Sequence, residues 1–350
     1  MQTIVILCGG ESGEHEVSLQ SARSIIQYIP RDRYRVIPVG ISKSGEWLSG
    51  DPLFANEDDP ANICLAQDLK VVRLEKGKLD GETIDAVFPI IHGTYGEDGC
   101  LQGMLQMQHV PFVGSGVLGS AVGMDKDIMK RLLIQDGIRC ARHRVIYHWQ
   151  KERPDYESIA ADLGKTLFVK PANLGSSIGI SKCRNADEYD KAVKYALQFD
   201  KKVIVEEFVE GQEIELSVLG NEKVEVSIPG EILPGEEFYS YDAKYIESDK
   251  TELRIPAQLE ASVVKELQAV AEKAYRLLEL EGLTRIDFFV KANGEVWLNE
   301  VNTLPGFTKI SMYPKLWEAS GISYPELIDR LIQLAIERHQ VEKILKRNRI

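Results

Sequence analysis

The sequence predicts an α/β protein whose first third forms a parallel, doubly wound sheet. Three apolar runs, at residues 3–8, 34–41 and 86–93, have the length and composition of buried strands. A glycine-bearing turn, GGESGE, follows the first run and leads into an amphipathic helix through residues 17–29. Strands that alternate with helices favour a parallel sheet, in which ligands bind at the carboxyl ends of the strands.

The composition limits the classes of partner and compartment. A net charge of −12 argues against nucleic acid or an anionic membrane as the main partner. Five cysteines without CxxC spacing indicate free thiols in a reducing compartment. The N-terminus lacks the basic region of a signal peptide, and the longest uncharged stretch, 99–124, is too polar for a membrane span. A soluble, cytoplasmic protein is therefore expected.

The chain of 350 residues is long enough for two or three domains. After about Gly114, a helix in DKDIMKRLLIQDGI carries Lys126, and a strand in TLFVKP reaches Lys170. A third region begins near KVIVEEFVEG. We predict domains at 1–114, 115–207 and 208–350. Within the third domain, a Tyr-rich and charged segment at about 235–253 lacks clear periodicity, as is typical of a lid or Ω-loop.

Asn293–Gly294, between two apolar runs, predicts a β-hairpin with a two-residue turn. Counting outward from that turn gives three opposed pairs: Ala292 with Glu295, Asp287 with Glu300, and Arg285 with Asn302. Alternation along the second strand also predicts one shared face for Val296, Leu298, Glu300 and Asn302.

Two opposed carboxylates repel each other unless a proton or a cation lies between them. Oxygen ligands from Asp287, Glu300 and Asn302 suit a hard cation such as Mg²⁺ or Mn²⁺. The hairpin therefore predicts a metal site, provided that the turn has two residues; the alternative is a strand end that frays into solvent.

Other segments carry polar groups that suit a nucleotide or a small substrate. The segment VKPANLGSSIGIS places Lys170 before a small-residue loop whose N–H groups can approach phosphate, although a surface hairpin is the alternative. His92 lies at the end of the third predicted strand, where its role is either structural or functional. Glu206 and Glu213 flank Phe208 and Val209, a set that suits adenine and ribose or simply an exposed strand.

Seven segments together resemble the D-alanine–D-alanine ligase family of ATP-grasp enzymes. They occur in the family's order: HGTYGEDG, MDK, FVKPANLGSSIG, VEEFVEGQE, YDAKY, RIDFF and NEVNTLPGFT. The resemblance runs from the first strand to about residue 336. It implies a three-domain ATP-grasp fold, α/β (α+β overall), with the nucleotide between the central and C-terminal domains.

The resemblance also implies a role for each matching residue. ATP phosphates would be bound by Lys126, Lys170, Ser177 and Lys244, and adenine and ribose by Glu206, Phe208, Val209 and Glu213. Two Mg²⁺ ions, with Mn²⁺ as the alternative metal, would be bound by Asp287, Glu300 and Asn302. The first substrate and the lid would be held by Glu14, Ser176 and Tyr245, with His92 in the same site. The oxyanion would be stabilised by Arg285 and Gly306, and the second carboxylate bound by Ser311.

The implied reaction is the ATP-dependent ligation of two D-alanine molecules through D-alanyl phosphate, which supplies peptidoglycan synthesis. Tyr245 resembles the dipeptide-forming members rather than those that make D-alanyl-D-lactate. A homodimer is expected. Two alternatives stay open: another ATP-dependent carboxylate–amine or carboxylate–hydroxyl ligase on this fold, and a nucleotide-binding sensor without turnover.

Overall fold

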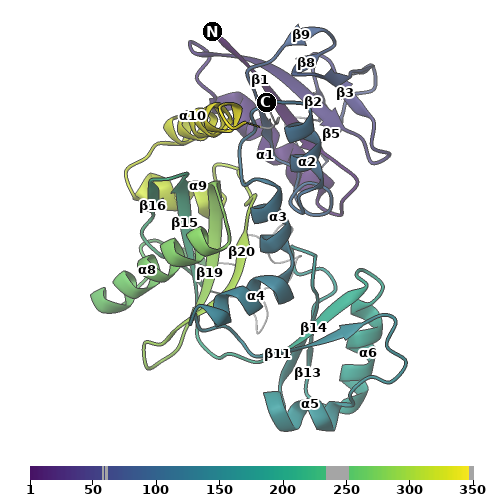
Figure 1. The fold of residues 1–350 in the computed structure, drawn as a ribbon, viewed down its shortest axis with the longest axis vertical. Helices are drawn as coiled ribbons and strands as arrows, with labels where there is room; N and C mark the ends of the chain where they lie inside the picture. The colour runs from purple at the N-terminus through teal and green to yellow at the C-terminus, as the bar shows by residue number, and fades with distance from the viewer. Residues whose placement is uncertain (57–58, 60–61, 234–251, 347–350) are drawn as a thin grey trace.

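The computed structural model describes residues 1–56, 59, 62–233 and 252–346. Figure 1 shows the N-terminal sheet at the top, a six-stranded sheet in the middle and a four-stranded sheet below. The predicted lid, with Lys244 and Tyr245, lies outside the described residues except for its last two positions. None of the helices in these described ranges combines the length and the apolar composition that a bilayer span requires.

The N-terminal sheet has the strand order β10-β1-β2-β3-β6. β1 (Gln2–Gly9) pairs in parallel with β2 (Tyr34–Ile41) and with β10 (Ala86–Pro89), so the predicted parallel strands are confirmed. β3 (Trp47–Ser49) and β6 (Lys70–Val71) add antiparallel pairs, which makes the sheet mixed at that edge. β10 ends four residues before the predicted position, at a proline that has no N–H for the ladder.

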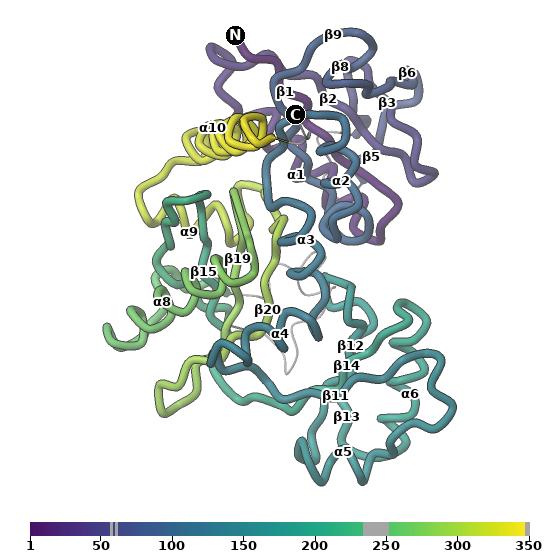
Figure 2. Tube along the Cα trace, in the orientation of Figure 1, coloured from purple at the N-terminus to yellow at the C-terminus, as the bar shows by residue number. Residues whose placement is uncertain are grey.

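Helices cover both faces of this sheet, as expected of a doubly wound fold. α1 (His15–Tyr28) shares one core with Ile4 and with α10 (Tyr324–Lys343), which returns from the far end of the chain. α2 (Cys100–Met107) shares the core of the other face with Val5. Figure 2 shows α10 lying beside the N-terminal sheet. Five short strands complete this part: β4 (Phe54–Ala55), β5 (Cys64–Leu65), β7 (Leu74–Glu75), β8 (Lys78–Leu79) and β9 (Glu82–Thr83).

The four-stranded sheet is antiparallel, with the order β11-β14-β12-β13. Its strands are β11 (His143–Tyr147), β12 (Leu167–Pro171), β13 (Ser181–Cys183) and β14 (Lys202–Glu207). Its two helices are α5 (Tyr156–Leu163) and α6 (Ala186–Ala196). Val169 and Val205 pack with these helices, so the alternation of side chains turns Lys170 and Glu206 to the opposite face.

The six-stranded sheet has the order β18-β17-β15-β19-β20, with β16 paired to β15. Its strands are β15 (Gln212–Gly220), β16 (Val224–Val226), β17 (Gly230–Leu233), β18 (Glu252–Arg254), β19 (Gly282–Val290) and β20 (Val296–Asn302). The helices next to it are α3 (Val117–Met124), α4 (Lys126–Gln135), α8 (Ala261–Leu277) and α9 (Met312–Ala319). Ile214 and Ile286 pack under α8 and α4, which turns Glu215, Arg285 and Asp287 to the other face.

The division of the cores differs from a simple three-part division of the chain. Met129 and Leu133 of α4 pack in the core of the six-stranded sheet, although the predicted central domain, 115–207, includes them. Likewise, Leu327 of α10 packs under the N-terminal sheet, although residues 208–350 form the predicted C-terminal domain. The apolar faces of these helices pack where they can be buried, whatever their position in the chain. The domain limits at 114 and 207 stay a prediction.

The hairpin between β19 and β20 has a three-residue loop, so the predicted two-residue turn is wrong. The N–H of Lys291 donates to Glu295 O at 3.0 Å, and the N–H of Gly294 donates to Lys291 O at 2.8 Å. Gly294 has a φ of 85°, the left-handed residue that completes a type I turn with a bulge. Lys291, not Ala292, is therefore the residue opposite Glu295.

A second irregularity restores the predicted register beyond this loop. The pairing shifts between Asp287 and Phe288, which leaves Asn299 as an extra residue in β20. Asp287 is then opposite Glu300, and Arg285 is opposite Asn302, so these two predicted pairs are confirmed.

The same bulge breaks the predicted stripe along β20. Val296 and Leu298 are buried in the core together with Val301, whereas Glu300 and Asn302 lie opposite Asp287 and Arg285. The prediction that all four alternating side chains share one face is therefore wrong, because the extra residue reverses the alternation. The bulge turns the polar end of the strand away from the core.

Candidate active site

Two strand faces and one helix carry the charged centre of the predicted site, and loops carry its other described residues. The outward face of the six-stranded sheet carries Arg285 and the predicted metal ligands, and the outward face of the four-stranded sheet carries Glu206. α4 connects the two: Lys126 Nζ is 3.6 Å from Glu300 Oε2, and Lys130 Nζ is 2.9 Å from Glu206 Oε1. These two lysines are four residues apart and therefore share one face of the helix.

Arg285 lies in a strip of acids on β15, β19 and β20. Its Nε and Nη2 donate to the two carboxylate oxygens of Asp287, both at 2.7 Å, and its Nε is 2.9 Å from Glu215 Oε2. Asn302 Nδ2 also donates to Asp287, at 3.0 Å. Burial opposes the guanidinium charge, but Asp287 and Glu215 outweigh it and raise the pKa of Arg285. The strip therefore holds a permanent cation among its carboxylates.

Glu206 is buried between two lysines. Lys170 Nζ is 2.6 Å from Glu206 Oε2, and Lys130 occupies the other carboxylate oxygen. Burial opposes the charge of Glu206, but the two lysines outweigh it and lower its pKa to about 2. The carboxyl group therefore stays ionised throughout the neutral range.

This pKa predicts acid-dependent stability. A carboxyl whose pKa is lowered in the folded state stabilises that state above its ordinary value of 4.5, and the contribution is lost as the pH falls toward about 2. The shift, 4.5 minus about 2, corresponds to roughly 3 kcal/mol. The gap in free energy of unfolding between wild type and Glu206→Gln should narrow by about this amount over that pH range. Chemical denaturation at a series of pH values measures the gap, and a constant gap would contradict the assignment.

The loop at 172–179 connects the four-stranded sheet to the N-terminal part of the chain. Lys126 Nζ donates to Leu174 O at 2.8 Å, and the hydroxyl of Ser176 donates to the Glu14 carboxylate. Ser176 and Ser177 have φ values of 52° and 59°. Backbone N–H groups of a turn can form a concavity that suits an anion. The loop thus places N–H donors and a lysine next to Glu14.

The Ser176–Glu14 bond predicts a substrate effect. In the reaction that the sequence resemblance implies, Ser176→Ala should raise the KM for the amino-acid substrate roughly 10-fold. A hydrogen bond to a charged group contributes about 1.5 kcal/mol or more, and Glu14 would lose that partner. Initial rates at saturating ATP measure the change. Ser181→Ala, in β13 beyond the loop, is the matched control and should leave the KM unchanged. Equal values for the two variants would remove Ser176 from the site.

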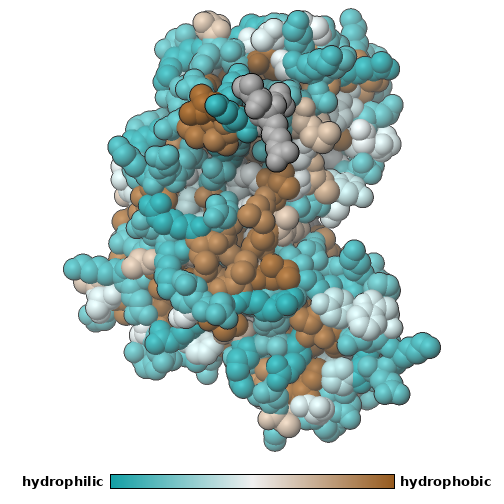
Figure 3. Space-filling view, in the orientation of Figure 1, coloured by the Kyte–Doolittle hydropathy of each residue, from teal (hydrophilic) through white to brown (hydrophobic). Residues whose placement is uncertain are grey.

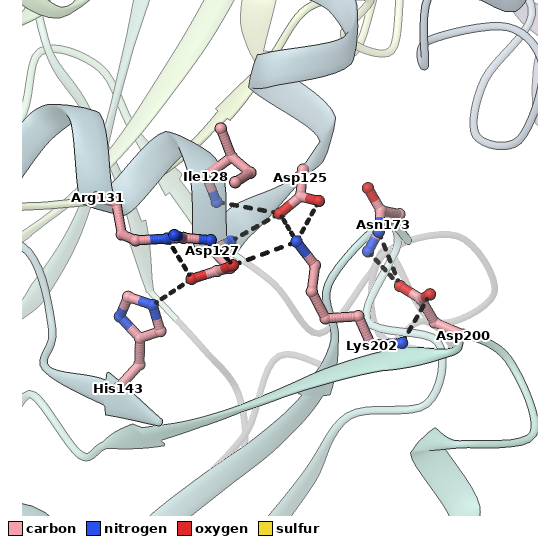
Figure 4. Close-up of polar contacts among 8 residues, drawn as sticks. All are labelled: Asp125, Asp127, Ile128, Arg131, His143, Asn173, Asp200 and Lys202. Atoms are coloured by element: carbon pink, nitrogen blue, oxygen red, sulfur yellow. Dashed lines mark hydrogen bonds and ion pairs between the residues drawn. The ribbon is translucent and has the colours of Figure 1, made fainter. Parts of the chain in front are cut away.

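A polar cluster at the start of α4 fixes the helix to the four-stranded sheet (Figure 4). Lys202 Nζ donates to Asp125 Oδ1 at 2.6 Å and to Asp127 Oδ2 at 3.2 Å. His143 Nε2 is 3.1 Å from Asp127 Oδ1. Asp125 also accepts from two N–H groups of the first turn, as an N-cap residue does. Since Lys126 lies between the two aspartates, the cluster holds its backbone in place.

His92 connects the N-terminal sheet to the loop after β20. Its Nδ1 is 2.9 Å from Leu304 O, and its Nε2 is 3.2 Å from Ser21 Oγ. The same Ser21 oxygen accepts from the N–H of Phe307 at 3.4 Å. Burial alone would lower the pKa of His92, but the Glu97 carboxylate outweighs it and raises the pKa. His92 therefore lies beside the segment that contains Gly306.

Gly306 and Ser311 lie close together at the start of α9. A Cβ added at Gly306 would lie 3.3 Å from Ser311 Oγ. Ser311 is the N-cap position of α9, and its hydroxyl accepts from the N–H of Thr308 at 3.1 Å. An N–H donor and a hydroxyl thus share one small region beside the N-terminus of a helix, where negative charge is favoured.

Phe208 and Val209 directly follow β14, an inner strand of the four-stranded sheet. Phe208 is 45% exposed, whereas Val209 is buried. The Phe208 ring centroid is 6.0 Å from that of Phe168 and 4.9 Å from Lys182 Nζ. An exposed ring next to a buried acid, Glu206, suits a planar base with a polar edge.

Comparison with known proteins identifies the family. A family model described as "D-ala D-ala ligase N-terminus" matches residues 3–115, and one described as "D-ala D-ala ligase C-terminus" matches residues 132–333. The chain belongs to the D-alanine–D-alanine ligase family. Members of this ATP-dependent ligase family join two D-alanine molecules to D-alanyl-D-alanine for peptidoglycan synthesis. The ATP-grasp fold and the enzyme class predicted from the motifs are thereby confirmed.

Relatives of both kinds match the chain along nearly all of its length. The D-alanine–D-alanine ligase of Shouchella clausii is 51% identical, with 97% of this chain and 96% of the relative aligned. The solved D-alanine–D-alanine ligase of Coxiella burnetii has a TM-score of 0.84 at 36% identity, with 98% and 97% covered. The D-Ala:D-Ser ligase VanG of Enterococcus faecalis has a TM-score of 0.83 at 34% identity, with 95% and 99% covered.

The donor set on β19 and β20 fits the divalent metal that the D-alanine–D-alanine ligase family implies. Among the described residues, no group of three or more His, Cys, Asp or Glu side chains is close enough together to hold a metal ion. However, Asp287 and Glu300 are directly opposed, and Asn302 contacts Asp287. Carboxylate and amide oxygens are the ligands that Mg²⁺ and Mn²⁺ prefer. The residues therefore fit a hard cation, which Asp287 would bind while it also accepts from Arg285.

Three residues beside the candidate site of this D-alanine–D-alanine ligase family member were not predicted from the sequence, although the sequence contains a signal for two of them. Lys130 follows Lys126 by four residues, the spacing that puts both on one helix face. Glu215 lies in EIELSV, where alternation separates it from the apolar Ile214 and Leu216. Lys202 gave no such signal, because its contacts with α4 depend on how the sheet and the helix pack.

Proposed function

We propose that this chain forms D-alanyl-D-alanine through a D-alanyl phosphate intermediate, at a site between its two antiparallel sheets. The observation that supports this most is the pairing of Lys126 with Glu300 and of Lys170 with Glu206. It places one phosphate-binding cation beside the metal ligands and the other beside the acid that contacts adenine. The ligase of Bacillus anthracis, 25% identical with a TM-score of 0.75, has been solved in complex with ATP.

In the first step, a carboxylate oxygen of one D-alanine attacks the γ-phosphorus of ATP. The new oxygen–phosphorus bond gives an acyl phosphate, and the bond from the γ-phosphorus to the bridging oxygen breaks, so that ADP leaves. Lys126, Lys170 and the N–H groups around Ser177 neutralise the charge on the transferring group. A divalent metal held by Asp287, Glu300 and Asn302 supplies further charge neutralisation when bound.

In the second step, the amine of another D-alanine attacks the acyl carbon. The tetrahedral intermediate carries an oxyanion, which the Arg285 guanidinium and the N–H of Gly306 stabilise. The attack forms the C–N bond, and collapse of the intermediate breaks the C–O bond to the phosphate. The proton lost from the nitrogen balances the departing phosphate, which leaves as hydrogen phosphate. Arg285 suits this role because Asp287 and Glu215 hold it charged and fixed.

The remaining predicted residues bind the substrates. Glu14, fixed by Ser176, binds the ammonium group of the first D-alanine, and His92 lies in the same region. Ser311 binds the carboxylate of the second D-alanine. The adenine ring packs on Phe208 and Val209, Glu206 accepts from its amino group, and Glu213 binds the ribose.

Several finer assignments stay predictions. They include two metal ions rather than one, Mn²⁺ as an alternative to Mg²⁺, and a homodimer. Tyr245 and Lys244, predicted to contact the substrate site and the phosphates, lie outside the described residues. Figure 3 shows apolar surface over α3, where Val117 and Leu118 are exposed. Sedimentation equilibrium of the purified protein tests the homodimer directly.

A coupled assay of ADP and phosphate release tests the function. With Mg²⁺ and ATP, D-alanine should support turnover, whereas L-alanine should not. D-lactate and D-serine, offered together with D-alanine, test whether the acceptor is specific, since the VanG relative is named a D-Ala:D-Ser ligase. Absence of ADP release with D-alanine would overturn the proposal, and equal use of D-lactate would move the chain to the ester-forming ligases.

A further inference from the structure

Lys130 has no role in the reaction derived above, yet it is among the most deeply buried side chains. Only 1% of the residue is exposed, and its ammonium lies 2.9 Å from Glu206 Oε1. A buried ammonium loses its hydration at a cost of several kcal/mol, and a methionine of similar volume would fill the same space without that cost. The charge of Lys130 therefore calls for an explanation other than packing.

Glu206 explains the charge. Its carboxylate is only 2% exposed and has one lysine on each oxygen, with Lys170 Nζ 2.6 Å from Oε2. The two lysines come from different parts of the fold, because Lys130 lies on α4 and Lys170 on β12. Together they fix the plane of the carboxylate next to the exposed ring of Phe208.

The two lysines have different roles when the nucleotide binds. In the proposed reaction, Lys170 binds a phosphate of ATP and thereby shares or leaves Glu206. Without a second cation, the buried carboxylate would then lose its counter-charge and gain a proton or turn away. Lys130 lies on the rigid helix α4, four residues from Lys126, and can stay with Glu206 when Lys170 turns to the phosphate.

We propose that Lys130 is a positioning residue that keeps Glu206 ionised and correctly oriented to accept from the 6-amino group of the purine. The inference rests on the proposed nucleotide site. It adds to that site the cation Lys130, which maintains the contact of Glu206 with the base. A carboxylate held in this way favours a 6-amino purine over a 6-oxo purine, whose oxygen would face a negative charge.

Nucleotide binding without turnover provides the test. Calorimetry of the intact protein with Mg²⁺ gives Kd for ADP and for inosine diphosphate, which differ at position 6 of the base. Lys130→Met should weaken ADP binding about 10-fold or more while changing Kd for inosine diphosphate by less than about 3-fold. The ratio of the two values should therefore approach one, a change that general loosening of the fold does not produce.

Two further variants make the result decisive. Lys130→Met added to Glu206→Gln should change Kd for ADP by less than about 2-fold, because Lys130 acts through the Glu206 charge. Arg131→Met, next on α4 with its side chain 58% exposed, is the matched control for loss of a cation and should leave the ratio unchanged. Lys130→Gln, neutral but able to donate in the buried site, should shift the ratio in the same direction as Lys130→Met.

Two outcomes would overturn the inference. The first is an unchanged ratio of the two Kd values in both Lys130→Met and Lys130→Gln. The second is the same loss of ADP binding when Lys130→Met is added to Glu206→Gln. Should Lys130→Met fail to fold, Lys130→Gln alone decides by the same ratio. Turnover is a separate readout. If the wild type is inactive but binds ADP more tightly than inosine diphosphate, and the Lys130 variants lose this selectivity, the ligase function is refuted and the role of Lys130 stands. If the wild type is active and the Lys130 variants keep its Kd ratio, the ligase function stands and the role of Lys130 is refuted.

Discussion

Arg285→Met lowers kcat about 10²–10³-fold, the typical effect of losing one oxyanion donor, while KM for ATP changes only a few-fold. The reason is that negative charge on the acyl oxygen develops only in the transition state, so the guanidinium contributes little to ground-state binding. Arg285 is fixed for this role by Asp287 and Glu215, both within 2.9 Å. Steady-state rates with varied ATP and varied D-alanine separate the two parameters.

Arg254→Met is the matched control for this variant. Arg254 also pairs with a buried carboxylate on the six-stranded sheet, since its Nη1 is 2.9 Å from Glu231 Oε2. The control therefore carries a similar loss of a buried ion pair, but outside the assigned oxyanion site. We expect it to keep kcat within about 3-fold of wild type. A similar kcat for Arg285→Met would show that the oxyanion is stabilised by other donors.

Asp287→Asn has the second large expected effect. The change removes a carboxylate that lies opposite Glu300 and accepts from Arg285 and Asn302. Loss of a residue that merely supports a metal ligand costs 10–100-fold in metal affinity, so loss of a direct ligand should raise the Mg²⁺ concentration for half-maximal activity about 100-fold or more. Activity titrated with Mg²⁺ at fixed ATP measures this value.

Glu231→Gln serves as the control for Asp287→Asn. It neutralises another buried acid of the same sheet and leaves the opposed pair on β19 and β20 intact. Its half-maximal Mg²⁺ concentration should equal that of wild type. If Asp287→Asn also kept the wild-type Mg²⁺ dependence and lost only kcat, the carboxylate would act on Arg285 rather than on the metal.

Local sequence patterns predicted much of the fold. The apolar runs at the start of the chain predicted β1, β2 and the parallel pairing, because burial of both faces leaves a clear signal in composition. The antiparallel strands β3 and β6 were not predicted, since they are two or three residues long and depend on pairing partners rather than on their own sequence. The packing of α10 on the first strand has no local signal at all.

The hairpin shows the limit of such reasoning in one place. Counting from Asn293–Gly294 gave the correct partners of Arg285 and Asp287, yet the turn on which the count rested is wrong. An extra residue in the loop and an extra residue at Asn299 compensate for each other. Neither has a distinctive composition, because a bulge is decided by what the neighbouring strand and the site require.

The candidate site was predicted best where one short segment carries several of its residues. Motifs named Lys170, Ser176 and Asp287 because each lies among residues that are recognisable on their own. The buried partner Lys130 required knowledge of which faces of α4 and the four-stranded sheet meet. Charge pairing between elements far apart in the sequence is a property of packing, and no single segment encodes it.

The position of α10 has a consequence for how the protein is made. Its side chains Leu327, Ile328 and Leu331 fill the same core as Ile4 and Phe88, so the first sheet lacks part of its cover until the last helix exists. The ribosome synthesises the chain from its N-terminus. The N-terminal sheet therefore stays partly uncovered while the four-stranded and six-stranded sheets are synthesised. The core of the N-terminal sheet can therefore be completed only after α10 has been synthesised, later than every strand of the other two sheets.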